Sequence, residues 1–152
     1  MTPFMALTLS IIEVSLPIFK KSTFVQAVRE GCRYGITFQT TYKGTTYGTQ
    51  TDAIKAVVED NSMGFLNASN ANLITVTYYD QVTFNAVSGS GANADGNIIK
   101  VSLTGYTHNW INPINWIYGS QRFQVTANPL TINAVSADRL ESLPSGSTRP
   151  SP

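Results

Sequence analysis

Residues 11–21 read IIEVSLPIFKK, and the role of this stretch decides the fold. It belongs to an apolar segment, residues 3–19, whose one charged side chain is Glu13. A run of about 17 apolar residues is the lower limit for a helix that crosses a bilayer. Glu13 and Pro17 are unusual in such a helix, because a carboxylate is costly in lipid and proline lacks a backbone N–H. The segment predicts a helix with an apolar surface and two constrained positions.

The helical pattern continues beyond the two lysines that close this stretch. Small and apolar residues recur at spacings of three and four, as on one face of an amphipathic helix: Phe24, Ala27, Val28, Gly31, Cys32 and Gly35. We predict one helix of roughly 30 residues, apolar on all sides in its first half and on one side in its second. In that second half, Ala27, Gly31 and Gly35 form a strip of small residues, which allows close approach to a sheet or another helix.

Four residues of the first half carry specific expectations. Pro17 cannot donate to the carbonyl of Glu13, so a bend is expected there. Lys20 and Lys21 are expected where the chain reaches lipid headgroups or water. Glu13 is costly in lipid and among helices, so it should find a partner, such as Lys20 or Lys21 of another copy, or lie near a bilayer edge.

Shorter patterns follow the long helix. Thr51 and Asp52 resemble a helix start, which predicts a short helix at about 52–62 after an irregular loop. Alternating residues predict three strands, at about 73–79, 97–106 and 129–136. In the second strand, one face is expected to carry Ile99, Val101, Leu103 and Gly105, and the other Lys100, Ser102, Thr104 and Tyr106.

These elements predict an α+β fold, in which a long N-terminal helix, hydrophobic and then amphipathic, packs on a small antiparallel sheet with one extra short helix. The chain is expected to have three parts. They are a hydrophobic membrane or filament-core segment at 1–20, a globular domain at 21–142, and an extended Pro/Ser-rich tail at 143–152.

The composition disfavours several classes of function. Charged residues make up 12% of the 152 residues and the net charge is +1, so no basic field points to nucleic acid. Cys32 and His108, the one cysteine and the one histidine, are too few for a zinc site. We expect Cys32 to be a small buried residue and His108 to lie in a loop. No catalytic or phosphate-binding motif is present, so we expect no enzyme, no cofactor and no metal.

The segment 109–119, NWINPINWIYG, concentrates aromatic residues. Trp110, Trp116 and Tyr118 offer a possible platform for stacking sugars. Such loops also serve as satellite core or as subunit contacts. A membrane-tethered adhesion or carbohydrate-binding module that uses this loop is therefore the alternative function.

Two stretches carry a resemblance to a known family. The first, SIIEVSLPIF with the later word AVREGCRYG, lies within Ser10–Gly35, and the second, NIIKVSLTGY with PLTINAVSADRLE, lies within Asn97–Glu141. Together they resemble the TadE-like family, the pseudopilins of tight-adherence (Tad/Flp, type IV-like) pili. The match is at these positions: Glu13, Arg29, Glu30, Gly31, Arg33, Tyr34, Gly35, Arg139 and Glu141. Before Met1 the family has a cleavage site and a longer apolar run, so this N-terminus looks shortened.

The resemblance implies a pilin-like structural subunit. Such a protein is anchored in the inner membrane of the cell envelope and then enters an extracellular pilus or pseudopilus filament, with its first helix in the filament core. Its implied partners are copies of itself or other pilin subunits, the pilus assembly machinery, and membrane lipid before assembly.

Overall fold

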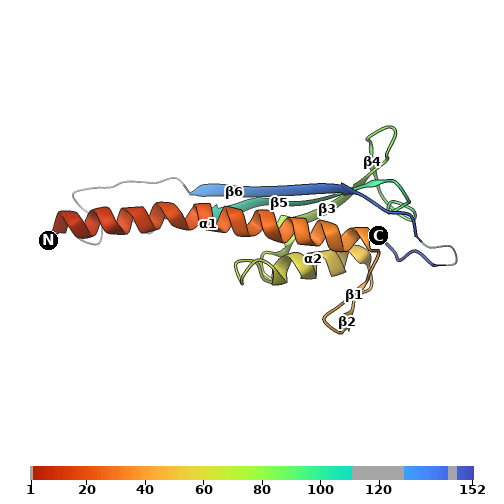
Figure 1. Ribbon diagram of the computed structural model, residues 1–152, viewed down its shortest axis with the longest axis horizontal. Helices are drawn as coiled ribbons and strands as arrows, with labels where there is room; N and C mark the ends of the chain where they lie inside the picture. The colour runs from red at the N-terminus through yellow and green to blue at the C-terminus, as the bar shows by residue number, and fades with distance from the viewer. Residues whose placement is uncertain (1, 111–128, 144–146) are drawn as a thin grey trace.

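A computed structural model describes residues 2–110, 129–143 and 147–152 of the protein. It shows an α+β fold in which a long helix runs along the long axis of the molecule (Figure 1). The described helices are α1 (Thr2–Ile36), α2 (Gln50–Asp60) and the short 3-10 helix η1 (Ala71–Leu73). The described strands are β1 (Thr41–Tyr42), β2 (Thr45–Thr46), β3 (Ile74–Tyr79), β4 (Ala86–Val87), β5 (Ile98–His108) and β6 (Leu130–Arg139).

Two antiparallel sheets are present in the described residues. The larger sheet has the strand order β4-β3-β5-β6, and the smaller one is the hairpin β1-β2. In the larger sheet, Val76 pairs with Val101, which pairs with Ser136 on β6. The predicted strand at 73–79 is confirmed, whereas those at 97–106 and 129–136 extend further, to His108 and Arg139. The strand β4 was not predicted.

The long helix is confirmed as one continuous element of 35 residues. Pro17 lies inside it and is buried, and it does not interrupt the helix. The second half of α1 packs between α2 and the larger sheet, and Figure 1 shows α2 on one side of α1 with β5 and β6 on another. The core is built of fully buried residues from all three parts: Phe24, Val28, Cys32, Ile54, Val58, Ile99, Val101 and Leu103. The amphipathic second half is therefore confirmed, as is the burial of Cys32.

A β-bulge in β5 corrects the prediction for the end of this strand. Leu103 pairs with Ala134 and Tyr106 pairs with Ile132, so two residues of β5 face Asn133 alone. Gly105 adopts a φ of +79°, and its N–H donates to Asn133 Oδ1 at 2.8 Å. Because of the extra residue, every later side chain of β5 points to the face of the sheet opposite to the one that simple alternation predicts.

The exchange turns two side chains toward α1. Tyr106, predicted to face away from the core, packs with its ring centroid 4.7 Å from that of Phe24. His108, predicted to lie in a loop, is the last residue of β5 and is 5% exposed.

The start of α2 also differs from the prediction. The helix spans Gln50–Asp60 instead of about 52–62, because Thr49 is the N-cap. The Thr49 hydroxyl accepts a hydrogen bond from the Asp52 N–H at 3.1 Å and donates to the Asp52 carboxylate at 2.8 Å. A threonine followed by an acid three residues later forms such a cap, so Asp52 marks the third helical position and not the first.

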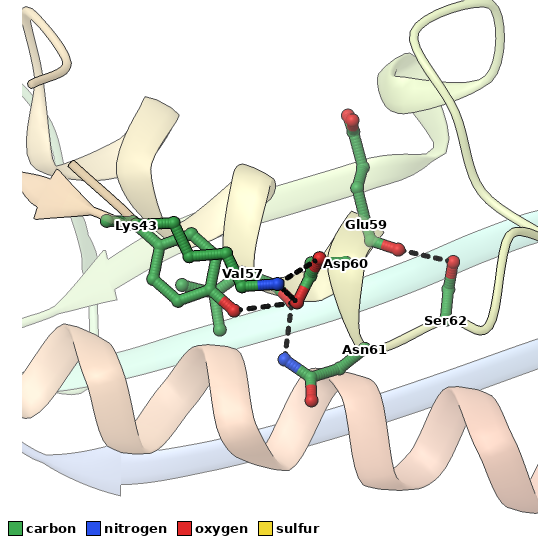
Figure 2. Close-up of polar contacts among 7 residues, drawn as sticks. Lys43, Val57, Glu59, Asp60, Asn61 and Ser62 are labelled. Atoms are coloured by element: carbon green, nitrogen blue, oxygen red, sulfur yellow. Dashed lines mark hydrogen bonds and ion pairs between the residues drawn. The ribbon is translucent and has the colours of Figure 1, made fainter. Parts of the chain in front are cut away.

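The segment between the helices was predicted as an irregular loop but contains the hairpin β1-β2. Lys43 and Gly44 form its turn with φ values of +47° and +81°, as a two-residue hairpin turn requires. Figure 2 shows Lys43 against the end of α2, where its Nζ lies 2.7 Å from Asp60 Oδ1. The Tyr42 hydroxyl donates to Asp60 Oδ2 at 2.8 Å. These contacts lower the pKa of Asp60, the Lys43 hydrogen bond most of all.

Gln50 joins four parts of the chain in a buried polar network. Its Nε2 donates to the Gly35 carbonyl at 2.6 Å, and its Oε1 accepts from Asn93 Nδ2 at 2.7 Å. The Gln50 N–H donates to the Ser151 carbonyl at 2.8 Å, and Asn93 also donates to the Pro150 carbonyl at 3.0 Å. The described part of the tail, without helix or strand, is thus held against the start of α2.

Candidate assembly surface on the first helix

The first half of α1 leaves a continuous series of large apolar side chains in solvent. We call this the apolar helix surface, and its members are Phe4, Met5, Leu7, Leu9, Ile11, Ile12, Val14, Ile18 and Phe19. Phe4 is 76% exposed and Ile18 is 67% exposed. Large contiguous apolar patches on a protein surface mark sites of interaction with another protein or with a membrane.

The apolar helix surface is exposed because the two halves of α1 differ in what packs against them. The second half has α2 and the larger sheet to cover its apolar side, with Phe24, Ala27 and Val28 each 0% exposed. No helix among the described residues is apolar enough over sufficient length to cross a membrane.

A small polar cluster marks the boundary between the two halves. It comprises Glu13 and Lys20 on α1 and His108 on β5, and we call it the polar cluster. Lys20 Nζ lies 3.2 Å from His108 Nδ1 and donates to it when that nitrogen carries no proton. The same ammonium lies 5.2 Å from the ring centroid of Phe65 and 5.4 Å from that of Tyr106, which are cation–π distances.

Lys20 therefore corrects one expectation. It is half-buried against the globular domain of its own chain, where it was expected at headgroups or water. Lys21 is exposed. Two adjacent lysines thus have different surroundings, because consecutive residues of a helix point about 100° apart and only one of them faces the end of β5.

Glu13 lies on the side of α1 that faces His108. It is half-buried, and its Oε1 has no hydrogen-bond partner among the described residues. The Glu13 carboxylate acts on His108 electrostatically and raises its pKa. The partner from another subunit that the sequence analysis proposed for Glu13 stays a prediction.

The environment of His108 favours the neutral imidazole. Burial lowers the pKa of His108 below its ordinary value of 6.5, and the positive charge of Lys20 lowers it further, while Glu13 opposes both. His108 Nε2 is buried and has no partner among the described residues. The ring of Trp110 packs edge-on against the imidazole, with centroids 5.5 Å apart.

The strip of small residues lies inside the chain's own core. Ala27 is fully buried, and a methyl group at Gly31 would overlap Val58 Cγ2 of α2. A methyl group at Gly35 would lie 2.5 Å from Ile99 Cδ1 and 3.0 Å from Ile54 Cδ1. The strip therefore serves the contact of α1 with α2 and β5 within the subunit, and it leaves no surface there for another copy.

The charged residues of the AVREGCRYG sequence lie on the face of α1 opposite the strip of small residues. Arg29, Glu30 and Arg33 are exposed, and Arg33 Nη1 lies 3.5 Å from Glu30 Oε1. Tyr34 is half-buried, and its hydroxyl donates to the Thr41 carbonyl at 2.9 Å. Tyr34 thus positions β1, whereas the exposed charges solvate the outer side of α1.

Arg139 and Glu141, which carry the resemblance near the C-terminus, lie at the end of β6 and just beyond it. Arg139 Nε donates to the Gly96 carbonyl at 3.2 Å, and its Nη2 donates to Gln81 Oε1 at 2.7 Å. Glu141 is exposed beside them and lines a shallow pocket with Arg139. Arg139 therefore ties β6 to the loops that flank β4.

The aromatic segment 109–119 lies mostly outside the described residues, including Trp116 and Tyr118. Trp110 is described, and it lines a groove between α1 and β6 in addition to its contact with His108. The sugar-stacking alternative stays a prediction. No cluster of three His, Cys, Asp or Glu side chains within the described ranges is placed to hold a metal ion.

Sequence reasoning identified Glu13 and Lys20 but not the contact with His108. The signal that could have found it is Gly105 within an alternating strand, because an isolated glycine there marks a bulge. No family model, curated protein or solved structure matches this chain.

Proposed function

We propose that the protein is a pilin-like structural subunit that assembles into a filament through the first half of α1. The observation that supports this is the division of one continuous helix. Its second half is buried in the subunit, and its first half holds the apolar helix surface in solvent. Burial of one large apolar side chain is worth about 1.5–3 kcal/mol, so packing this surface against other copies is strongly favourable.

Assembly through this surface requires a contact that repeats. A helix that projects from one end of a subunit can pack against the same helix of successive copies, which gives an open helical array. Before assembly, membrane lipid of the cell envelope covers the same apolar side chains, and the pilus assembly machinery transfers the subunit from lipid to an extracellular filament. Other pilin subunits are possible neighbours in the filament.

The polar cluster suits this role. The cost of the Glu13 carboxylate beside an apolar surface falls when a cation from another copy approaches it. Lys20 and Lys21 of a neighbouring copy carry such cations at the end of the same half of α1. A carboxylate with one buried oxygen that has no hydrogen-bond partner among the described residues thus favours one register of packing over others, as buried polar groups do in coiled coils.

Assembly is tested by introducing a charge into the apolar helix surface by substitution. The purified chain is transferred from detergent to buffer, and assembly is followed by sedimentation and electron microscopy. We expect the wild type to form filaments and Ile11→Asp to raise the concentration needed for assembly at least about tenfold. The matched control is Met63→Asp, because Met63 is 71% exposed and lies in the loop after α2.

Two results would contradict the proposal. One is a wild-type chain that stays monomeric after detergent removal. The other is an Ile11→Asp variant that assembles at the wild-type concentration. Circular dichroism and thermal unfolding of each variant establish that its fold is unchanged.

A further inference from the structure

The loop that joins β3 to β4 holds two large apolar side chains in solvent. Val82 is 77% exposed and Phe84 is 66% exposed. Asp80 Oδ1 organises the loop by accepting from the N–H groups of Val82 at 2.9 Å and Thr83 at 2.7 Å. The Phe84 N–H donates to the Asp80 carbonyl at 3.0 Å. Residues 80–85, which we call the hairpin tip, therefore present both apolar side chains on an ordered backbone.

The backbone of Phe84 has an unfavourable conformation. Its φ is +54°, in the left-handed region that costs a residue other than glycine about 1–2 kcal/mol. Backbone strain of this kind persists where the surrounding structure enforces it, and it is concentrated at binding sites. Phe84 is the aromatic residue that combines this conformation with exposure among the described residues, which makes it a candidate contact residue.

A groove of about 270 Å³ lies between α1 and the start of β6. The described residues that line it are mainly apolar: Val14, Pro17, Ile18, Lys21, Trp110, Leu130, Thr131, Ile132 and Asn133. A cavity of about 150 Å³ accommodates a benzene ring. The groove is therefore large enough for the ring of Phe84, with further space for Val82.

The hairpin tip and the groove lie at different ends of the sheet. The tip follows Tyr79, which pairs with Ile98, and Ile98 pairs with Arg139 at the end of β6. The groove is at the start of β6, near Leu130, which is about 30 Å away at 3.3 Å per residue. Figure 1 shows β4 near one end of the molecule and the start of β6 toward the other. The tip cannot reach the groove of its own chain.

We infer that the hairpin tip of one copy docks into the α1–β6 groove of the next copy. Opposite charges support this pairing. The one charged residue in 79–87 is the acid Asp80, and the one charged residue among the described residues of the groove is Lys21. An apolar projection that fits a groove elsewhere on the same molecule makes a head-to-tail contact, which extends into a fibre. The inference rests on the proposed function and names the second contact that sets the axial spacing of the filament.

The first test compares two residues of the same kind. Phe84 and Met63 are both large, exposed and apolar, with φ values of +54° and +55°. Asparagine tolerates this conformation, so Phe84→Asn and Met63→Asn should both fold. We expect Phe84→Asn to raise the concentration needed for filament formation at least about fivefold, since the anchor in the groove is lost, and Met63→Asn to leave it unchanged. Equal behaviour of the two variants in a chain that forms filaments would overturn the docking contact and leave the proposed function standing.

The second test traps the contact and needs only a pair of copies. In a Cys32→Ala background, copies with Phe84→Cys are mixed with copies of different mass that carry Ile18→Cys, and the mixture is oxidised. We expect a mixed disulfide dimer in much higher yield than from the control pair, Met63→Cys with Ile18→Cys. Equal yields would overturn the inference. If the wild type forms no filaments, the proposed function fails, and this yield still decides whether the tip docks in the groove.

Discussion

Lys20 of α1 lies 3.2 Å from His108 of β5, measured from Nζ to Nδ1, and this pair couples the free half of the helix to the sheet. The contact depends on the bulge at Gly105, which turns His108 toward the helix. The imidazole accepts from the ammonium only while His108 Nδ1 is unprotonated, so the junction of the two halves depends on pH.

The first prediction concerns that dependence. An unfolded chain takes up a proton on His108 near pH 6.5, whereas the folded chain does so at lower pH because the pKa is lowered. The unfolded state therefore binds more protons between the two values, and the free energy of unfolding decreases as the pH falls through this window. Above pH 6.5 the contribution is fully present. Urea unfolding of wild type and His108→Asn from pH 8 to pH 5 measures the difference.

In His108→Asn the amide oxygen can still accept a hydrogen bond from Lys20, but the side chain at position 108 no longer takes up a proton. We expect the stability of this variant to decrease less than that of the wild type between pH 7 and pH 5. Parallel curves for the two proteins would show that His108 does not carry the dependence.

A second prediction concerns the contact of α1 with α2. Alanine normally replaces glycine in a helix with a gain of about 1 kcal/mol. At Gly31 the added methyl overlaps Val58 Cγ2, so we expect Gly31→Ala to destabilise the chain by about 1–3 kcal/mol. Val58→Ala removes the obstructing atom, so Gly31→Ala should cost much less in that background. Additive effects in a double-mutant cycle by thermal unfolding would contradict the overlap.

The bulge provides a third prediction. Gly105→Ala places a side chain in the left-handed region, and the nearest atom that its methyl meets is Leu73 Cδ2 at 4.0 Å. The expected loss of about 1–2 kcal/mol thus comes from the backbone and not from a clash. Gly48→Ala is the control, because Gly48 has no positive φ and nothing within 4 Å of an added methyl. Chemical denaturation should show a loss for Gly105→Ala and little change for Gly48→Ala, and equal stabilities would refute the argument.

The fourth prediction concerns the buried network at Gln50. Gln50→Leu removes the hydrogen bond to the Gly35 carbonyl and the one from Asn93 Nδ2. The Gly35 carbonyl still accepts from the Phe38 N–H, and Asn93 still donates to the Pro150 carbonyl. One buried hydrogen bond contributes about 0.5–1.5 kcal/mol, so we expect the two lost bonds together to cost about 1–3 kcal/mol. Gln39→Leu is the control, because Gln39 is exposed. Differential scanning calorimetry should show a lower melting temperature for Gln50→Leu alone, and a melting temperature like that of the control would argue against the network.

Much of the architecture was readable from local pattern. The spacing from Phe24 to Gly35 predicted the buried face of α1, and alternation at Ile74, Val76 and Tyr78 predicted the inner face of β3. Such patterns are reliable because the helical and strand periods are properties of the backbone itself. The start of α2 was predicted two residues too late, from Thr51 beside Asp52, although Thr49 has the three-residue spacing to Asp52 that a cap requires.

Local patterns in the sequence determine the continuous helix, its exposed apolar half and the strands β3, β5 and β6, because each depends on residues close together in the chain. The side chains that meet across those elements are known from the three-dimensional arrangement alone. Gly31 meets Val58, and one extra residue at Gly105 turns His108 to Lys20. These pairings rest on contacts between distant segments. Gly105 marks a bulge in the sequence, but the sequence does not say which side chain His108 meets once the faces of the strand are exchanged.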